Sequence, residues 1–244
     1  MNWKKAFFVL ADVLLAVYVV LAMTSFNRPD NASQTCTQVD IEIERDEVPG
    51  LLAPHDVGRL LQQAGMYPLQ QPLNDVKTRR IEETLKANPL IEDAVCYKTI
   101  SGHVAIRISQ RMPVMRVMPD GEPDYFLDQY GQPMPARIYT TNLPVATGCI
   151  SRDYAKKHLS KIGLLLAEDE FWQNQVVQFN VCQDGALELV PRVGSHIVEL
   201  GQPTDVRHKL ERLRKFYRYG LSQTGWNQYR RINVEYSNQI VCKR

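Results

Sequence analysis

Residues 81–117 constrain the fold of this 244-residue chain more than any other stretch. Asn88-Pro89 predicts a helix end, because proline disfavours helical geometry in the residue before it. Residues 103–109 place an apolar side chain at every second position, which is the period of a strand with one buried face. Ser101-Gly102 predicts the hairpin turn before that strand. Pro113 lacks a backbone donor and predicts the end of its pairing.

The residues before this stretch complete one small domain. Alternating residues 39–43 predict a first strand with an acidic outer face. Apolar residues at helical spacing predict a helix over residues 57–64, with Gly65 at its end, and a second helix over residues 74–86. The predicted order is therefore β-α-α-β-β over residues 38–117.

A second domain is predicted from residue 118 to residue 244. Residues 125–132 predict an aromatic strand and a tight turn, and Ser151 is a good N-cap for a helix over residues 151–167. A later helix carries an apolar stripe that includes Leu210 and Leu213, so the domain has at least two helices. Three short strands are predicted at 176–182, 186–191 and 196–200, and two last strands at 231–236 and 239–244, joined by Ser237-Asn238.

The first residues predict a membrane span. Residues 6–23 are nearly all apolar, and 18 residues at about 1.5 Å each reach about 27 Å. Lys4 and Lys5 precede the run, which favours an N-terminal cytoplasmic tail over residues 1–5, a transmembrane helix over residues 6–24 and a linker over residues 25–37. A cleaved signal peptide is the rival interpretation. Asp12 lies inside the run and is a candidate contact for a partner's membrane helix.

Composition and motifs favour a binding protein over an enzyme. The chain has no H-E-x-x-H, G-x-S-x-G, S-x-x-K, P-loop or G-x-G-x-x-G pattern, so no catalytic, cofactor-binding or metal-binding residues are predicted. Residues 201–244 contain ten Lys or Arg against three Asp or Glu. These charges are expected on the outer face of a helix, and no nucleic-acid partner is predicted. The five Cys residues are expected as buried thiols, with one disulfide left open.

The combination of segments resembles one known family. Ile81-Glu82, Leu85, Asn88-Pro89, Ile91, Ala94 and Arg111-Met112-Pro113-Val114 resemble the POTRA module of the FtsQ/DivIB family of bacterial cell-division proteins. The aromatic strand at 125–132 and the Leu-Pro-x-x-x-Gly segment at 143–148 resemble the second domain of that family. The resemblance implies an α+β fold, made of a transmembrane helix, a POTRA domain and an FtsQ-type domain of mixed, largely antiparallel β structure.

The resemblance also implies a function. Members of this family are non-enzymatic scaffolds of the division machinery, and they bind FtsB-like and FtsL-like partners and thereby couple to septal peptidoglycan synthesis. The implied location is the inner membrane at the division septum, with the domains in the periplasm. The family receives a segment of FtsB by strand addition on its last strands. The matching residues here are Tyr236, Ser237, Asn238, Gln239, Ile240, Val241 and Cys242.

Two other readings stay open. A POTRA chaperone of outer-membrane protein assembly shares the first module, but it is expected to carry repeated POTRA units or a barrel. An anchored cell-wall enzyme is the second, and it is expected to carry a catalytic signature.

Overall fold

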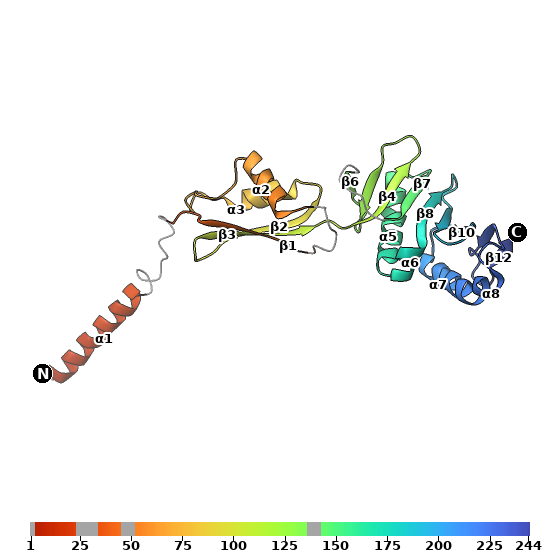
Figure 1. The fold of residues 1–244 in the computed structure, drawn as a ribbon. Coiled ribbons are helices and arrows are strands. Elements are labelled where there is room, and N and C mark those ends of the chain that lie inside the picture. The colour runs from red at the N-terminus through yellow and green to blue at the C-terminus, as the bar shows by residue number, and fades with distance from the viewer. Residues whose placement is uncertain (1–2, 23–33, 45–51, 136–142) are drawn as a thin grey trace. The chain divides into compact units, whose positions relative to one another are not determined.

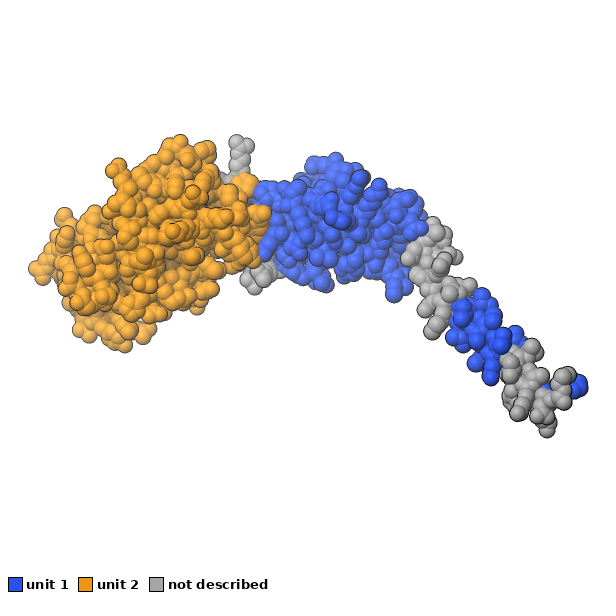
Figure 2. Space-filling model, turned by 180° about the vertical axis from the view of Figure 1, so that it is seen from behind, with its two compact units in different colours: residues 1–44, 53–109 blue, residues 45–52, 110–244 orange. Residues whose placement is uncertain are grey.

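The computed structural model describes residues 3–22, 34–44, 52–135 and 143–244. The chain divides into two compact units, which Figure 2 shows in different colours. The first unit comprises residues 1–44 and 53–109, and the second comprises residues 45–52 and 110–244. Along the chain, the first unit ends at Ser109, whereas the predicted first domain extends to Val117.

The predicted transmembrane helix is wrong. Helix α1 (Trp3–Leu21) ends before the predicted limit at residue 24. It includes Lys4 and Lys5 near its start and Asp12 near its middle, which leaves too short an uninterrupted apolar stretch. No helix in the described part of the chain is long and apolar enough to cross a bilayer. The membrane contact predicted for Asp12 presupposed a span and stays a prediction.

The first unit has the predicted β-α-α-β-β order (Figure 1). After α1 its elements are β1 (Gln38–Glu44), α2 (Pro54–Gln63), α3 (Thr78–Lys86), β2 (Ile91–Lys98) and β3 (His103–Gln110). The strands form one sheet in the order β1-β3-β2, in which β1 runs parallel to β3. Helices α2 and α3 lie on one face of this sheet.

Alternation along β3 fixes which face of the small sheet is buried. Val104, Ile106 and Ile108 are at most 1% exposed and share the core with Leu61 and Leu85 of the two helices. The side chain of Arg107 points the other way and is exposed. The predicted register is therefore confirmed.

This register yields a stability prediction. Ile106→Asp places an unpaired charge in the core, at a cost of several kcal/mol against a typical domain stability of about 5–15 kcal/mol. In the full chain, we expect amides of β1, β2 and β3 to lose hydrogen-exchange protection. Arg107→Gln is the matched control, since Arg107 Nε only pairs with exposed Glu42 at 3.3 Å and Glu44 at 3.4 Å. Protection retained in Ile106→Asp and lost in Arg107→Gln would contradict the register.

The second unit is built on a sheet of nine strands. The strands are β4 (Pro113–Pro119), β5 (Tyr125–Asp128), β6 (Pro133–Pro135), β7 (Val145–Gly148), β8 (Val176–Val181), β9 (Leu187–Pro191), β10 (Ile197–Gly201), β11 (Arg231–Asn233) and β12 (Val241–Lys243). Their order in space is β12-β11-β10-β9-β8-β7-β4-β5-β6. The pairs β4–β7, β7–β8 and β10–β11 are parallel, so the sheet is mixed. β12 and β6 are its two end strands in the described part of the chain.

The helices of the second unit pack against this sheet (Figure 1). They are α4 (Arg152–Tyr154), a π-helical turn (Ala155–Leu159), α5 (Ser160–Ala167), α6 (Glu170–Gln175), α7 (Val206–Phe216), a second π-helical turn (Tyr217–Leu221) and α8 (Ser222–Thr224). The predicted N-cap is confirmed, because the Ser151 hydroxyl accepts a hydrogen bond from the Tyr154 N–H at 3.1 Å. Gly148 ends β7 at φ +98°, and a side chain there would collide with the carbonyl of Val181.

A buried aromatic cluster joins the π-helical turn that follows α7 to the residue that precedes β10. The Tyr217 hydroxyl and His196 Nε2 are hydrogen-bonded at 2.9 Å, and both side chains are 2% exposed. The Tyr217 ring also contacts Trp226 and Trp172, with centroids 5.1 Å and 6.2 Å away. Burial lowers the pKa of His196 below its ordinary value of 6.5 and raises the pKa of Tyr217.

Stability should therefore fall in mild acid. Below the ordinary His pKa the unfolded chain binds a proton at residue 196 that the folded chain does not, so the free energy of unfolding drops as the pH falls from 6.5 towards 5. One such proton contributes a slope of up to about 1.4 kcal/mol per pH unit. Denaturant unfolding followed by tryptophan fluorescence measures this slope, since Trp172 and Trp226 both contact Tyr217.

The matched variants are His196→Gln and His158→Gln. His158 also has a lowered pKa, from burial and from Lys157 and Lys161, but it is only half-buried. Removing His196 should flatten the slope more than removing His158 does. An unchanged slope in His196→Gln would contradict the assignment.

Candidate partner-binding site

The last strand of the chain lies at one end of the nine-stranded sheet. β12 pairs antiparallel with β11, with Ile232 opposite Cys242 and Asn233 opposite Val241. No other strand of the described residues pairs with its outer side. An end strand presents backbone N–H and C=O groups that an extended segment can pair with.

The connection between β11 and β12 is longer than predicted. The sequence predicted two strands joined by Ser237-Asn238, whereas β11 ends at Asn233 and β12 begins at Val241. The intervening residues 234–240 form a loop, which we call the site loop. Val234 anchors its start in the core at 0% exposure. The Tyr236 side chain is 52% exposed, so this aromatic is available at the surface and not part of the core.

The predicted site residues divide into two groups. Ser237, Asn238 and Gln239 are exposed with Tyr236 on the site loop, and Val241 is 38% exposed on β12. Ile240 and Cys242 are half-buried and pack against the core of the second unit. Their side chains therefore hold β12 in place. The groups of β12 that remain available to a partner are its outward backbone groups and the face that carries Val241.

Arg212 of α7 fastens the site loop at both ends. Its Nη1 donates to the Val234 carbonyl at 3.3 Å, and its Nη2 donates to the Gln239 carbonyl at 2.6 Å. Arg212 is not among the predicted site residues, because the basic residues of this helix are expected from sequence on its solvated outer face. The helical stripe places Arg212 next to buried Leu213, but the two carbonyls that it reaches have no sequence signature.

An ion-pair ladder fixes β11, the neighbour of β12. Arg231 Nη1 lies 2.6 Å from Glu199 of β10 and 3.0 Å from Glu188 of β9. Asn233 donates to the other oxygen of Glu199 at 2.9 Å. The hydrogen bond from Arg231 is the main cause of the lowered pKa of Glu199. These contacts tie three neighbouring strands together beneath the site.

A groove of about 570 Å³ lies beside the site loop. Its lining includes Glu235 and Ser237 of the loop and Lys209 and Arg212 of α7. Lys209 is 7% exposed and donates to the Gln202 carbonyl at 2.8 Å, and burial lowers its pKa. The prediction that the basic residues lie on an outer face is therefore wrong for this one.

Gly201, at the end of β10, allows Glu235 of the site loop to pack closely against the sheet. Gly201 has φ +68°, and the Glu235 side chain fills the space that a side chain at residue 201 would need. The loop thus approaches the end of β10 closely.

The five cysteines are all free thiols. Cys36 and Cys96 are buried, Cys182 and Cys242 are half-buried, and Cys149 is exposed. Burial raises the pKa of Cys96 to about 12. Buried thiols as small hydrophobic side chains are therefore confirmed for two of the five. The described residues include no group of three or more His, Cys, Asp or Glu that could hold a metal ion.

These features define a protein of two α+β modules, of which the second ends in an open sheet edge. Residues 112–243 match the family model described as FtsQ/DivIB, C-terminal related, and residues 34–109 match the model of a POTRA-like domain. The first match covers more than half of the chain, so the chain belongs to the FtsQ/DivIB C-terminal related family. The two domains together are of the type found in a division-related scaffold. The family implies the division septum as the site of action. Comparison with curated proteins gives no match.

Arg212 should control the order of the site loop. In Arg212→Lys the charge stays, but one ammonium cannot reach both carbonyls in the same geometry. Loss of one or two charge-assisted hydrogen bonds should raise hydrogen exchange of residues 235–240 by about tenfold or more. The exposed Arg218 provides the control as Arg218→Lys. Equal exchange in both variants would show that Arg212 does not hold the loop.

Proposed function

We propose that this protein is a non-enzymatic scaffold of the bacterial division machinery that captures an extended segment of an FtsB-like partner along β12. Through FtsB-like and FtsL-like partners and other division proteins, it couples to septal peptidoglycan synthesis. The family membership and the POTRA-like first domain support the division role.

The two ends of the large sheet differ in the backbone donors that they expose, and this difference supports the proposed binding mode. At one end, β6 consists of Pro133, Met134 and Pro135, and neither proline has a backbone N–H to offer. This end strand is thus blunted against further pairing. At the other end, β12 consists of Val241, Cys242 and Lys243; the backbone groups of Val241 and Lys243 face β11, and the donor and acceptor of Cys242 face outward. Of the two described ends, only β12 suits strand addition.

The site loop supplies the side-chain part of the same interface. Tyr236 exposes half of its surface beside β12, and aromatic residues often dominate binding energy at protein interfaces. Backbone pairing provides general affinity, with roughly 0.5–1.5 kcal/mol net for each hydrogen bond. An exposed aromatic anchor next to the edge adds selectivity, because the incoming segment needs an apolar side chain at the matching position.

Tyr236→Ala and Val241→Pro test this mode. Both variants should fold, since Tyr236 is half-exposed and the Val241 N–H faces only β11, so that Val241→Pro weakens the pairing of the end strand alone. Both should co-purify at least tenfold less FtsB-like and FtsL-like protein, because an interface anchor of this kind is worth about 2 kcal/mol. Cells that depend on either variant should grow as filaments.

Matched controls separate the interface from general effects. Tyr219→Ala removes an aromatic that is 65% exposed on another part of the second unit. Val241→Thr keeps the backbone donor and a β-branched side chain. Both controls should retain partner capture. Stable Tyr236→Ala protein that captures the partner normally would remove Tyr236 from the interface, and the same result for Val241→Pro would exclude β12 pairing.

A further inference from the structure

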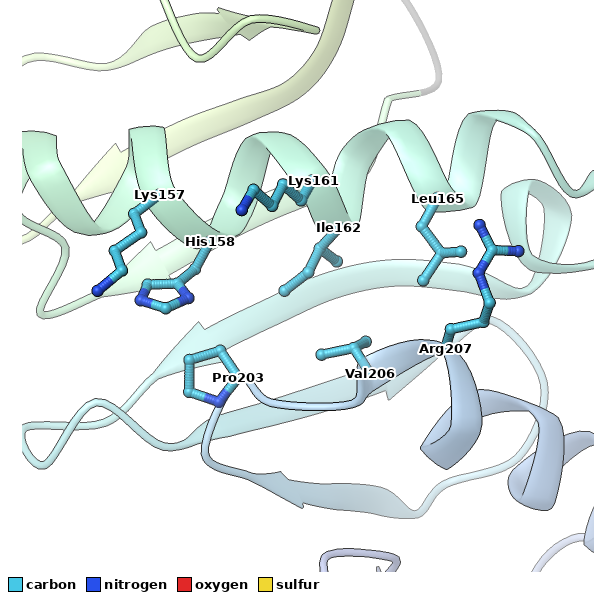
Figure 3. Close-up of a pocket in the computed structure, with 8 residues that line it drawn as sticks. All are labelled: Lys157, His158, Lys161, Ile162, Leu165, Pro203, Val206 and Arg207. Carbon is cyan, nitrogen blue, oxygen red and sulfur yellow. The ribbon is translucent and has the colours of Figure 1, made fainter.

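A second groove lies on the large unit, lined by residues other than those of the site loop. Its volume is about 380 Å³. Figure 3 shows one wall formed by Lys157, His158, Lys161, Ile162 and Leu165 of the helix at 152–167. Pro203, Val206 and Arg207 form the facing wall, at the start of α7.

The rim of this groove is cationic. Lys157 and Lys161 are exposed and lie one helical turn apart on the same wall, and no carboxylate of the described residues forms an ion pair with either. Arg207 stands on the opposite wall and pairs with Glu168 at 3.3 Å. Arg207 is thus already paired with a carboxylate, whereas within the described ranges neither lysine has such a partner.

The electrostatic effect of these lysines is seen on the side chain between them. The pKa of His158 is lowered by burial first and then by Lys157 and Lys161. His158 is also held in place by the Tyr154 ring, with centroids 5.0 Å apart. At neutral pH the groove therefore presents two fixed ammonium groups beside a neutral imidazole.

The floor of the groove is apolar. Ile162 and Val206 are almost fully buried, at 3% and 8% exposure, and Leu165 and Pro203 are half-buried. The groove therefore suits a ligand that combines negative charge at its edges with an apolar centre.

We propose that this groove binds an acidic amphipathic segment of a partner protein, with its carboxylates on Lys157 and Lys161 and an apolar side chain on the floor. A bilayer surface fits less well, because a flat surface reaches the lysine rim but not the buried floor. A free phosphate would satisfy the lysines and leave the apolar floor without a contact. The segment carries both features, and its capture does not depend on pairing with β12.

The probe is a fluorescein-labelled helical peptide with Leu along one face and Glu on its flanks, titrated against the full chain. Binding should weaken as salt rises, because the rim contacts are charge pairs at the surface. Lys157→Glu with Lys161→Glu should weaken binding by about tenfold or more. Leu165→Asn should weaken binding without changing its salt dependence. The control is Lys98→Glu with Lys215→Glu, which makes the same change in net charge at exposed lysines outside the groove.

The outcomes are distinct. Loss of binding in the groove variants, with normal binding in the control pair, supports the proposal. Equal binding by a peptide with Lys in place of Glu would overturn it, as would equal binding by the charge-reversed protein. So would binding of phosphatidylglycerol vesicles or pyrophosphate in the absence of peptide binding. If the Glu pair lowers the melting temperature, Lys157→Gln with Lys161→Gln gives the same comparison without new charge. Normal capture of the FtsB-like partner by the groove variants would show that the groove acts independently of β12.

Discussion

A sheet that does not close on itself leaves two rows of unpaired backbone groups, and the second unit depends on how its two ends are treated. At β6 the sequence Pro133-Met134-Pro135 removes two of the three donors. At β12 the outward donor of Cys242 remains, and the strand is held from within by Ile240 and Cys242, which pack against the core. An end that is kept open and also rigid favours binding, because a flexible strand would lose more entropy on pairing.

Rigidity at this end comes from contacts across several elements. Arg231 joins β11 to Glu199 and Glu188 on the two strands beyond it, and Arg212 holds the site loop through two carbonyls. The π-helical turn that continues α7 is joined to the start of β10 by the buried pair of Tyr217 and His196. The order of the site loop thus depends on α7, and a change in the packing of α7 would reach the loop before β12 through Arg212.

Sequence patterns predicted the elements whose cause is local. The alternation of Val104, Ile106 and Ile108 is enough to place β3 and its buried face, and Ser151 is enough to begin its helix. The prediction of a membrane span is wrong. It was based on an apolar run, whereas α1 also includes the charged residues Lys4, Lys5 and Asp12. The predicted two-residue turn at Ser237-Asn238 is also wrong. Arg212, which is distant in sequence, holds the longer loop through two carbonyls, and such a contact leaves no local sequence pattern.

The basic residues of the last part of the chain show why a charge count does not define a binding surface. Lys209 is buried on a carbonyl, Arg212 holds a loop, and Arg231 joins strands. Arg214 pairs with Asp169 at 2.5 Å and stacks over Phe171. Their charge is used within the fold. Lys157 and Lys161, earlier in the chain and inconspicuous in sequence, form no ion pair with the residues that the structure describes, and they line a groove with an apolar floor. Electrostatic attraction for a partner comes from charges that the fold leaves unpaired, and these two lysines meet that condition.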